Sequence, residues 1–187
     1  VYIYRIAAVQ NYHQKQSFFM IGNGYVGFLP IPILLMAVLY LVFLVVINKS
    51  LAGRYLYATG GNPTAARISG INVDRLKILT FVVSSSLAAI AGVILVSRMN
   101  SGQPNAGQGF ELEVISGVIL GGTSLGGGEG TLIGTLIGVI IMRIINNGII
   151  ILGWNQDLQI VVSGFVLIAA VYLDSRRKLA RAKIITI

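Results

Sequence analysis

Two long apolar runs, at residues 28–47 and 78–97, constrain this chain more than any other feature of its sequence. Each run is 20 residues long and contains no charged side chain. A helix of about 20 apolar residues spans the hydrocarbon core of a bilayer, which is about 30 Å thick. Charged residues make up 11% of the chain, whereas soluble domains average about 25%. These features predict an all-α fold, a polytopic integral membrane helical bundle.

The positive charge of the chain, net +8, is concentrated beside the apolar runs. Five Lys or Arg side chains fall in the loop at residues 48–77 and five in the tail at residues 174–187. Because cytoplasmic loops carry an excess of Lys and Arg, we predict that this loop and the C-terminus are cytoplasmic. No aromatic residues alternate with the basic ones as in nucleic-acid-binding surfaces, so we expect no nucleic acid partner.

An even number of crossings must separate the two cytoplasmic segments. Three spans are predicted between them, at residues 78–97, 131–150 and 157–173. The fourth must be the short stretch 110–126, since neighbouring protein can cover the ends of a short hydrophobic element. The alternative is a re-entrant element there, which would leave the tail outside. With residues 28–47 the chain has about five spans, a cytoplasmic turn at residues 123–130, and residues 1–27 outside or at the outer interface.

A short polar helix is predicted inside the cytoplasmic loop. Asn62 suits its N-cap, and Pro63 suits its first position, where the missing N–H would have no intrahelical partner. Gly70 follows where a left-handed C-terminal cap is needed. A helix of about two turns is too short to be stable alone in water, so it must be braced. Its small face, which suits docking in a groove, consists of Ala65, Ala66 and Ser69. We therefore expect a transport subunit that is driven by a separate partner.

Glycines recur every four residues from the turn into the following helix. They are Gly126, Gly130, Gly134 and Gly138. Small residues let membrane helices approach closely, so we expect a helix-packing stripe, faced by Gly117, Gly121 and Gly122. The alternative is that this contact slides during gating. The glycine-rich turn lacks the Lys and Ser/Thr of a phosphate-binding loop, and we expect no ATP to bind here.

Arg143 lies well inside a predicted span, where an arginine costs about 2.5–3.5 kcal/mol on insertion scales. Asn146 and Asn147 follow at i+3 and i+4, on the same helix face. One interpretation is that the three side chains line a translocation path and bind a hydroxylated solute. The other is that Arg143 extends to the interface while the two Asn side chains bind neighbouring helices.

Several kinds of chemistry are disfavoured. Cysteine is absent and the chain has one histidine, so no nucleophile–base arrangement, metal-ligand cluster or cofactor is expected. No acidic residue lies in the middle of a span, which disfavours a proton-coupled carrier. The chain begins at Val1 without a charged n-region or cleavage site, and we expect it to be the C-terminal part of a longer protein.

Four blocks of sequence, in the same order, resemble the ribose-type (monosaccharide) ABC transporter permeases. They lie at residues 53–72, 101–113, 118–131 and 146–153. The first contains Ala-Thr-Gly-Gly-Asn-Pro, a form closer to the sugar branch than to the related branched-chain amino-acid permeases. Arg143 departs from the pattern, because a small or apolar residue is expected at its position.

The resemblance implies a permease subunit of a bacterial ATP-driven sugar importer in the inner membrane. In that family two permease chains, identical or related, pair with two ATPase subunits that hydrolyse ATP, and an extracytoplasmic solute-binding protein delivers the sugar. The coupling helix of the family matches residues 63–69, so the Ala65 and Ala66 face would enter the ATPase cleft. The ATPase-coupling residues implied are Gly60, Gly61, Asn62, Pro63, Ala65, Ala66, Arg67, Ser69 and Gly70.

Alternatives to sugar import remain open at this stage. They are a permease for branched-chain amino acids or nucleosides, an ATP-independent channel or facilitator, and a membrane scaffold that transports nothing. The sequence names no particular sugar, because specificity in such systems lies largely in the binding protein.

Overall fold

The structure, a computed structural model, describes residues 9–10 and 16–185. The remaining residues lie outside the described part. They include the single histidine, much of the predicted outer segment and the end of the predicted tail. The described chain forms two compact units. One contains residues up to Tyr55 and Asn72–Gly107, and the other contains Leu56–Ile71 and residues from Gln108 onward. We predicted one transmembrane domain, and its helices are divided between these units.

The first unit contains two long apolar helices, α2 (Ile31–Lys49) and α5 (Val73–Met99). A short helix, α1 (Gln16–Asn23), packs against both of them. The Asn72 side chain caps α5 by accepting the Arg75 N–H at 3.0 Å. Since α1 joins the two apolar helices, it holds the unit together at one end.

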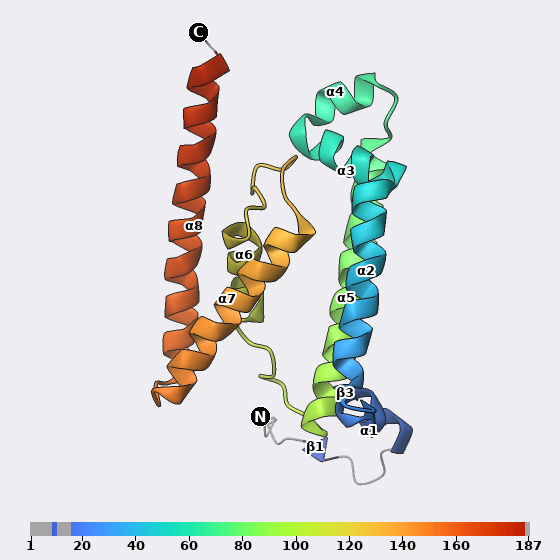
Figure 1. Ribbon diagram of the computed structural model, residues 1–187, viewed down its shortest axis with the longest axis vertical. Coiled ribbons are helices and arrows are strands. Elements are labelled where there is room, and N and C mark those ends of the chain that lie inside the picture. The colour runs from blue at the N-terminus through green and yellow to red at the C-terminus, as the bar shows by residue number, and fades with distance from the viewer. Residues whose placement is uncertain (1–8, 11–15, 186–187) are drawn as a thin grey trace, which may run out of the picture. The chain divides into compact units, whose positions relative to one another are not determined.

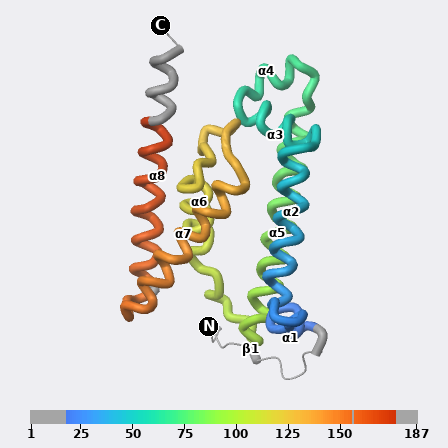
Figure 2. The backbone as a smooth tube through the Cα atoms, viewed as in Figure 1, coloured from blue at the N-terminus to red at the C-terminus, as the bar shows by residue number. Residues whose placement is uncertain are grey.

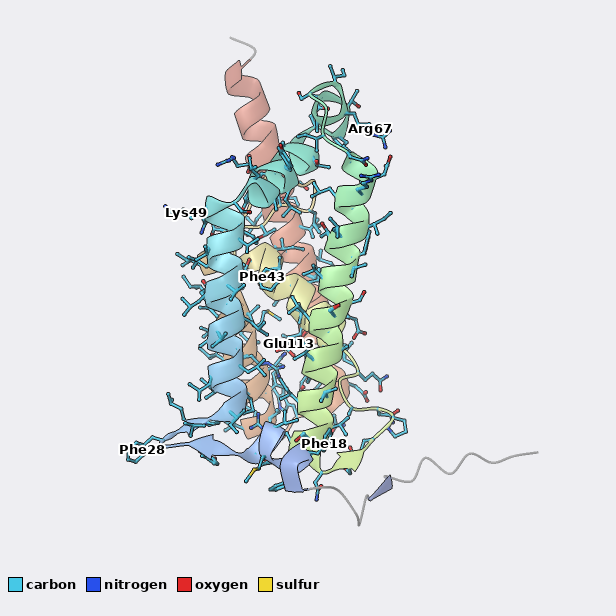
Figure 3. The ribbon with its side chains drawn as sticks, turned by 90° about the vertical axis from the view of Figure 1, so that its right-hand side faces the viewer. Phe18, Phe28, Phe43, Lys49, Arg67 and Glu113 are labelled. Carbon is cyan, nitrogen blue, oxygen red and sulfur yellow. The ribbon has the colours of Figure 1, made fainter. Side chains whose placement is uncertain are left out.

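A hairpin precedes α2 and marks the uncharged end of that helix. Strands β2 (Tyr25–Val26) and β3 (Leu29–Pro30) pair antiparallel. Figure 3 shows Phe28 at the tip of this hairpin and Lys49 at the other end of α2. The orientation of this helix in the membrane stays a prediction, made from the same charge at its Lys49 end.

Ser97 ties α1 to the end of α5. Its hydroxyl accepts the Gly22 N–H at 2.8 Å and donates to the Phe18 carbonyl. Just beyond, β1 (Val9–Gln10) pairs antiparallel with β4 (Ser101–Gly102). A buried hydroxyl with both partners supplied fixes the packing of a short helix against a membrane span.

The second unit contains three helices, α6 (Phe110–Leu120), α7 (Leu132–Ile151) and α8 (Gln156–Ile185). Helix α6 packs against both α7 and α8 (Figure 1 and Figure 2). Its Ser116 hydroxyl donates to the Ser163 carbonyl of α8 at 3.1 Å. The unit also takes in the end of α3 (Leu51–Gly61) and the short helix α4 (Pro63–Ile68).

Glycines set the distance between α6 and α7. A Cβ atom at Gly138 would overlap the Gly117 carbonyl oxygen, and one at Gly121 would overlap the Gly134 carbonyl. A Cβ atom at Gly117 would lie 3.0 Å from the Val139 Cα atom. The backbones therefore touch directly, as in other close-packed membrane helix pairs.

Four helices among the described residues are long and apolar enough to cross a membrane. They are Ile31–Lys49, Val73–Met99, Leu132–Ile151 and the Asp157–Arg176 part of α8. The predicted all-α polytopic bundle is confirmed.

The fifth predicted span, 110–126, corresponds to α6, which ends at Leu120 because Gly122, at φ +90°, turns the chain. Its 11 residues are about 16 Å long, roughly half the hydrocarbon thickness. The predicted tail is not separate from the last span, since α8 continues to Ile185.

Replacing Gly138 by Ala tests the close approach of α6 and α7. The added methyl group would meet the backbone of the facing helix, so we expect the free energy of unfolding to fall by about 1–3 kcal/mol. Gly148 lies on the same helix, and no atom of another described segment lies within 4 Å of a Cβ atom built there, so Gly148→Ala is the matched control. Denaturant titration of the full-length protein in detergent measures both. Equal stability of the two variants would contradict a direct backbone contact.

Candidate functional site

The predicted short helix exists with the caps that its sequence indicates. Helix α4 begins at Pro63, and the Asn62 side chain accepts the Ala65 N–H at 3.0 Å. Gly70 has φ +84° and follows the C-cap residue Ser69. These caps satisfy backbone groups that a helix of this length otherwise leaves unpaired. Figure 3 marks Arg67 in the last turn.

The exposed face of α4 differs from the predicted one at two residues. Ala66 was expected to face a partner, but its side chain is turned into the chain and is 4% exposed. Ala65 and Ser69 are exposed. Ile68, which sequence reasoning did not select, is 84% exposed. The sequence contained a pattern that could have identified it, because Ile68 is the one large apolar residue of α4 and lies at i+3 from Ala65.

The end of α3, just before α4, is held by the connection between α6 and α7. The Tyr57 hydroxyl donates to the Gly130 carbonyl at 2.8 Å. A Cβ atom at Gly60 would lie 2.5 Å from the Gly128 nitrogen, and one at Gly128 would lie 2.7 Å from the Gly61 Cα atom. We call the contact of Gly60 and Gly61 with Gly127 and Gly128 the glycine clamp. It supplies the brace that a helix as short as α4 requires.

The α6–α7 connection contains two of the four glycines predicted to form a stripe. Gly126 and Gly130 lie in this connection rather than on a helix. Gly134 and Gly138 lie on α7 and face α6. The spacing of four is therefore not one continuous helical surface, because α7 begins only at Leu132, after its N-cap Thr131.

Arg143 points toward α6 rather than standing alone in its span. Its Nε atom lies 3.0 Å from Glu113 Oε1, and its guanidinium lies 4.8 Å from the centre of the Phe110 ring. The Arg143 side chain is 56% exposed and that of Glu113 is 8% exposed. The contact is an ion pair without an aligned hydrogen bond to Oε1. Sequence reasoning missed this partner, although antiparallel pairing of Gly117 with Gly138 places residue 113 opposite residues 142–143.

The two asparagines after Arg143 have different environments. Asn146 is buried, and its Oδ1 atom has no hydrogen-bond partner among the described residues. Asn147 is exposed. The three side chains predicted as one polar lining therefore comprise an exposed cation, a buried amide and an exposed amide. A buried acceptor without a donor is costly, and this makes Asn146 a candidate for binding a group that supplies a hydroxyl.

No group of three or more His, Asp or Glu side chains within residues 9–10 and 16–185 is placed to hold a metal ion. The candidate site consists of the capped helix α4, its glycine clamp and, near the middle of α7, a polar cluster of Glu113, Arg143 and Asn146.

A double-mutant cycle tests the Glu113–Arg143 pair. Arg143→Leu leaves a buried carboxylate without its cation, and we expect a loss of about 1–3 kcal/mol in unfolding free energy, since a buried charged group has lost its partner. Glu113→Gln removes that charge, so Arg143→Leu should cost much less in the Glu113→Gln background. Strictly additive effects of the two substitutions on unfolding in detergent would show that the pair contributes no coupling.

A family model described as the permease component of branched-chain amino acid transport systems matches residues 2–171. The chain is 46% identical over 161 residues to the ribose import permease protein RbsC of Bacillus subtilis, covering 86% of this chain and 50% of that protein. It is 43% identical over 149 residues to the Escherichia coli protein of the same name, covering 80% and 46%. It is 42% identical over 168 residues to the L-arabinose transport system permease protein AraH of Escherichia coli, covering 90% and 51%.

The chain thus spans about half the length of the curated relatives that it matches. No solved structure matches it. These relatives are transport permeases, and with four apolar helices the chain is part of a multi-pass membrane protein. It belongs to the permease-component family of branched-chain amino acid transport systems, and within it to the ribose-type branch of sugar ABC transporter permeases.

Proposed function

We propose that this chain is part of the permease subunit of a bacterial ATP-driven sugar importer. It forms part of the translocation path and couples that path to a separate ATPase. The observation that carries the proposal is the capped and braced helix α4, which exposes an isoleucine on an otherwise small and polar surface. An exposed apolar side chain on a short, fixed helix suits insertion into a groove of a partner.

The docking residues are those that cap, brace or expose α4. Asn62, Pro63 and Gly70 fix its ends, and Gly60 and Gly61 hold it to the α6–α7 connection. Ala65, Ile68 and Ser69 form the exposed surface, and Arg67 adds a positive charge beside it. Ala66 supports this surface from within, since its side chain is buried. The partner for this face is an ABC ATPase subunit, which binds and hydrolyses the ATP.

The proposed topology has the docking segment, the α6–α7 connection and the end of α8 on the cytoplasmic side. Two hydrogen bonds support the placement of these segments on the same side of the membrane. Tyr57 of α3 donates to Gly130 of the α6–α7 connection, and Ser124 of that connection donates to Asp174 of α8. Helix α6 then runs between the two sides of the unit, from Phe110 to the connection. Its length is only part of a crossing, but α7 and α8 cover it, which is the condition under which irregular backbone is tolerated at membrane depth.

The polar cluster on α6 and α7 is proposed to lie along the solute path. Arg143 supplies donors, while Asn146 Oδ1 is a buried acceptor with no donor among the described residues. A sugar carries several hydroxyl groups, each both donor and acceptor, and can satisfy such groups when they are otherwise unpaired. Asn147 is exposed and would contact the same path from the next position on the helix.

The assembly proposed from the family is a pair of permease chains, identical or related, with ATPase subunits and an extracytoplasmic solute-binding protein in the bacterial inner membrane. Among sugars, those named for the relatives, ribose, L-arabinose and xylose, are the first to test. A branched-chain amino acid is the alternative solute, because the family description names that class.

Crosslinking from α4 tests the proposed docking. Ile68→Cys in the full-length protein should crosslink to the ATPase subunit, and the yield should change with bound nucleotide. Ala66→Cys, two residues away but buried, is the matched control and should react far less. Uptake of ribose, L-arabinose and xylose into proteoliposomes should require both the ATPase and ATP. Uptake without the ATPase, or equal absence of crosslinks at both positions in every nucleotide state, would contradict the proposal and favour a facilitator.

A further inference from the structure

We propose that the α6–α7 connection positions the docking helix α4 and carries its displacement to α7 and α8, with Gly60 and Gly128 as positioning residues. The inference rests on the proposed function, because it concerns how a force applied at α4 reaches the rest of the permease. It follows from four sets of contacts within the second unit.

The first is the glycine clamp itself, in which two backbones meet without side chains between them. A Cβ atom at Gly60 would lie 2.5 Å from the Gly128 nitrogen, and one at Gly127 would lie 2.5 Å from the Gly60 carbonyl oxygen. Gly127 and Gly128 also have φ values of +83° and +76°, which L side chains rarely adopt. Side chains can absorb a displacement by changing rotamer, but close-packed backbone transmits it.

The second is the hydrogen bond from Tyr57, one turn before the clamp on α3, to the Gly130 carbonyl at 2.8 Å. Gly130 lies next to Thr131, the N-cap of α7. The end of α3 is therefore joined to the connection at two separate points, and two points resist rotation as well as translation.

The third is the closure of the connection on itself. The Ser124 N–H donates to the Glu129 carbonyl at 3.0 Å, and the Gly127 N–H donates to the Ser124 carbonyl at 3.1 Å. The Ser124 hydroxyl accepts the Gly126 N–H at 3.3 Å. Despite its glycine content, this segment is a compact loop whose backbone is restrained by its own hydrogen bonds.

The fourth is the anchoring of the connection to two helices. Thr131 caps α7 by accepting the Gly134 N–H at 3.1 Å, and Thr123 lies 3.2 Å from Thr135 between their hydroxyl oxygens. On the other side, the Ser124 hydroxyl donates to Asp174 of α8 at 3.0 Å. A compact loop tied to α3, α7 and α8 moves them together.

Two glycine substitutions in the same connection separate this role from backbone strain. Gly128→Ala places a methyl group 2.7 Å from the Gly61 Cα atom, whereas the methyl group of Gly122→Ala meets no other part of the described chain within 4 Å. Both residues have positive φ, +76° and +90°, so both variants carry similar strain and only one breaks the clamp. Each is made in the full-length permease, assembled with its ATPase and binding protein in proteoliposomes. The probe is whichever of ribose, L-arabinose or xylose the wild-type protein takes up.

The readout is the amount of sugar taken up per ATP hydrolysed. Molecules lost to misfolding lower uptake and hydrolysis together, so a merely structural defect leaves this ratio unchanged. We expect the ratio to fall roughly tenfold or more in Gly128→Ala, because the clamp must separate, and to stay at the wild-type value in Gly122→Ala. Tyr57→Phe adds no bulk and removes one hydrogen bond, so its ratio should fall by about two- to tenfold, which keeps the test open if Gly128→Ala fails to assemble.

The outcomes distinguish this inference from the proposed function. A lowered ratio in Gly128→Ala or Tyr57→Phe, with the Ile68→Cys crosslink to the ATPase retained, supports the clamp as the transmitting contact. Wild-type ratios in every assembled variant, with ATP-dependent uptake intact, overturn the clamp and leave the docking function standing. If the wild-type protein itself shows no ATP-dependent uptake of any probe and no crosslink, the proposed function fails and the clamp fails with it.

Discussion

Direct backbone contact between α6 and α7 determines the arrangement of the second unit. In a bilayer, helices gain little from burying apolar side chains, since lipid is equally apolar, and their association depends on packing. The pairing of Gly117 with Gly138 and of Gly121 with Gly134 lets the backbones of the two helices touch over about one turn. This pairing also fixes their register. The register places the α6–α7 connection at one end of the helix pair and brings the residues of the polar cluster together at the other.

The same register accounts for a charged pair in an apolar setting. Four residues before Gly117 on α6 stands Glu113, and five after Gly138 on α7 stands Arg143, so antiparallel helices bring them together. The carboxylate is buried while most of the guanidinium side chain remains accessible. An arginine in a span is tolerated when it pairs with another group inside the bundle. The charge of Arg143 is therefore compensated by a neighbouring helix of the same unit.

Local features of the site were predictable from the sequence, and tertiary features were not. Asn62, Pro63 and Gly70 define the ends of α4 by capping chemistry that depends only on adjacent residues, and the observed helix agrees with them. The apolar spans are likewise set by length and composition. The burial of Ala66, by contrast, depends on the direction in which α4 leaves α3, which no periodicity in a six-residue helix specifies. The early end of α6 at Leu120 depends on a glycine turn inside an apolar run.

The N-terminus and the middle of α7 are held by interactions of different stiffness. At its N-terminus, the connection is fixed by backbone contacts and capping hydrogen bonds, which lose their geometry over small displacements. Near the middle of α7, about 18 Å further along the helix, the link to α6 is an ion pair made by a long and partly exposed side chain. Such a side chain can keep its charge interaction over a range of conformations, because Coulomb energy falls slowly with distance. We therefore expect a displacement of the glycine clamp to be transmitted along α7 with little deformation as far as the polar cluster. The contact that can change its geometry there is the Glu113–Arg143 ion pair, which belongs to the cluster proposed to face the solute.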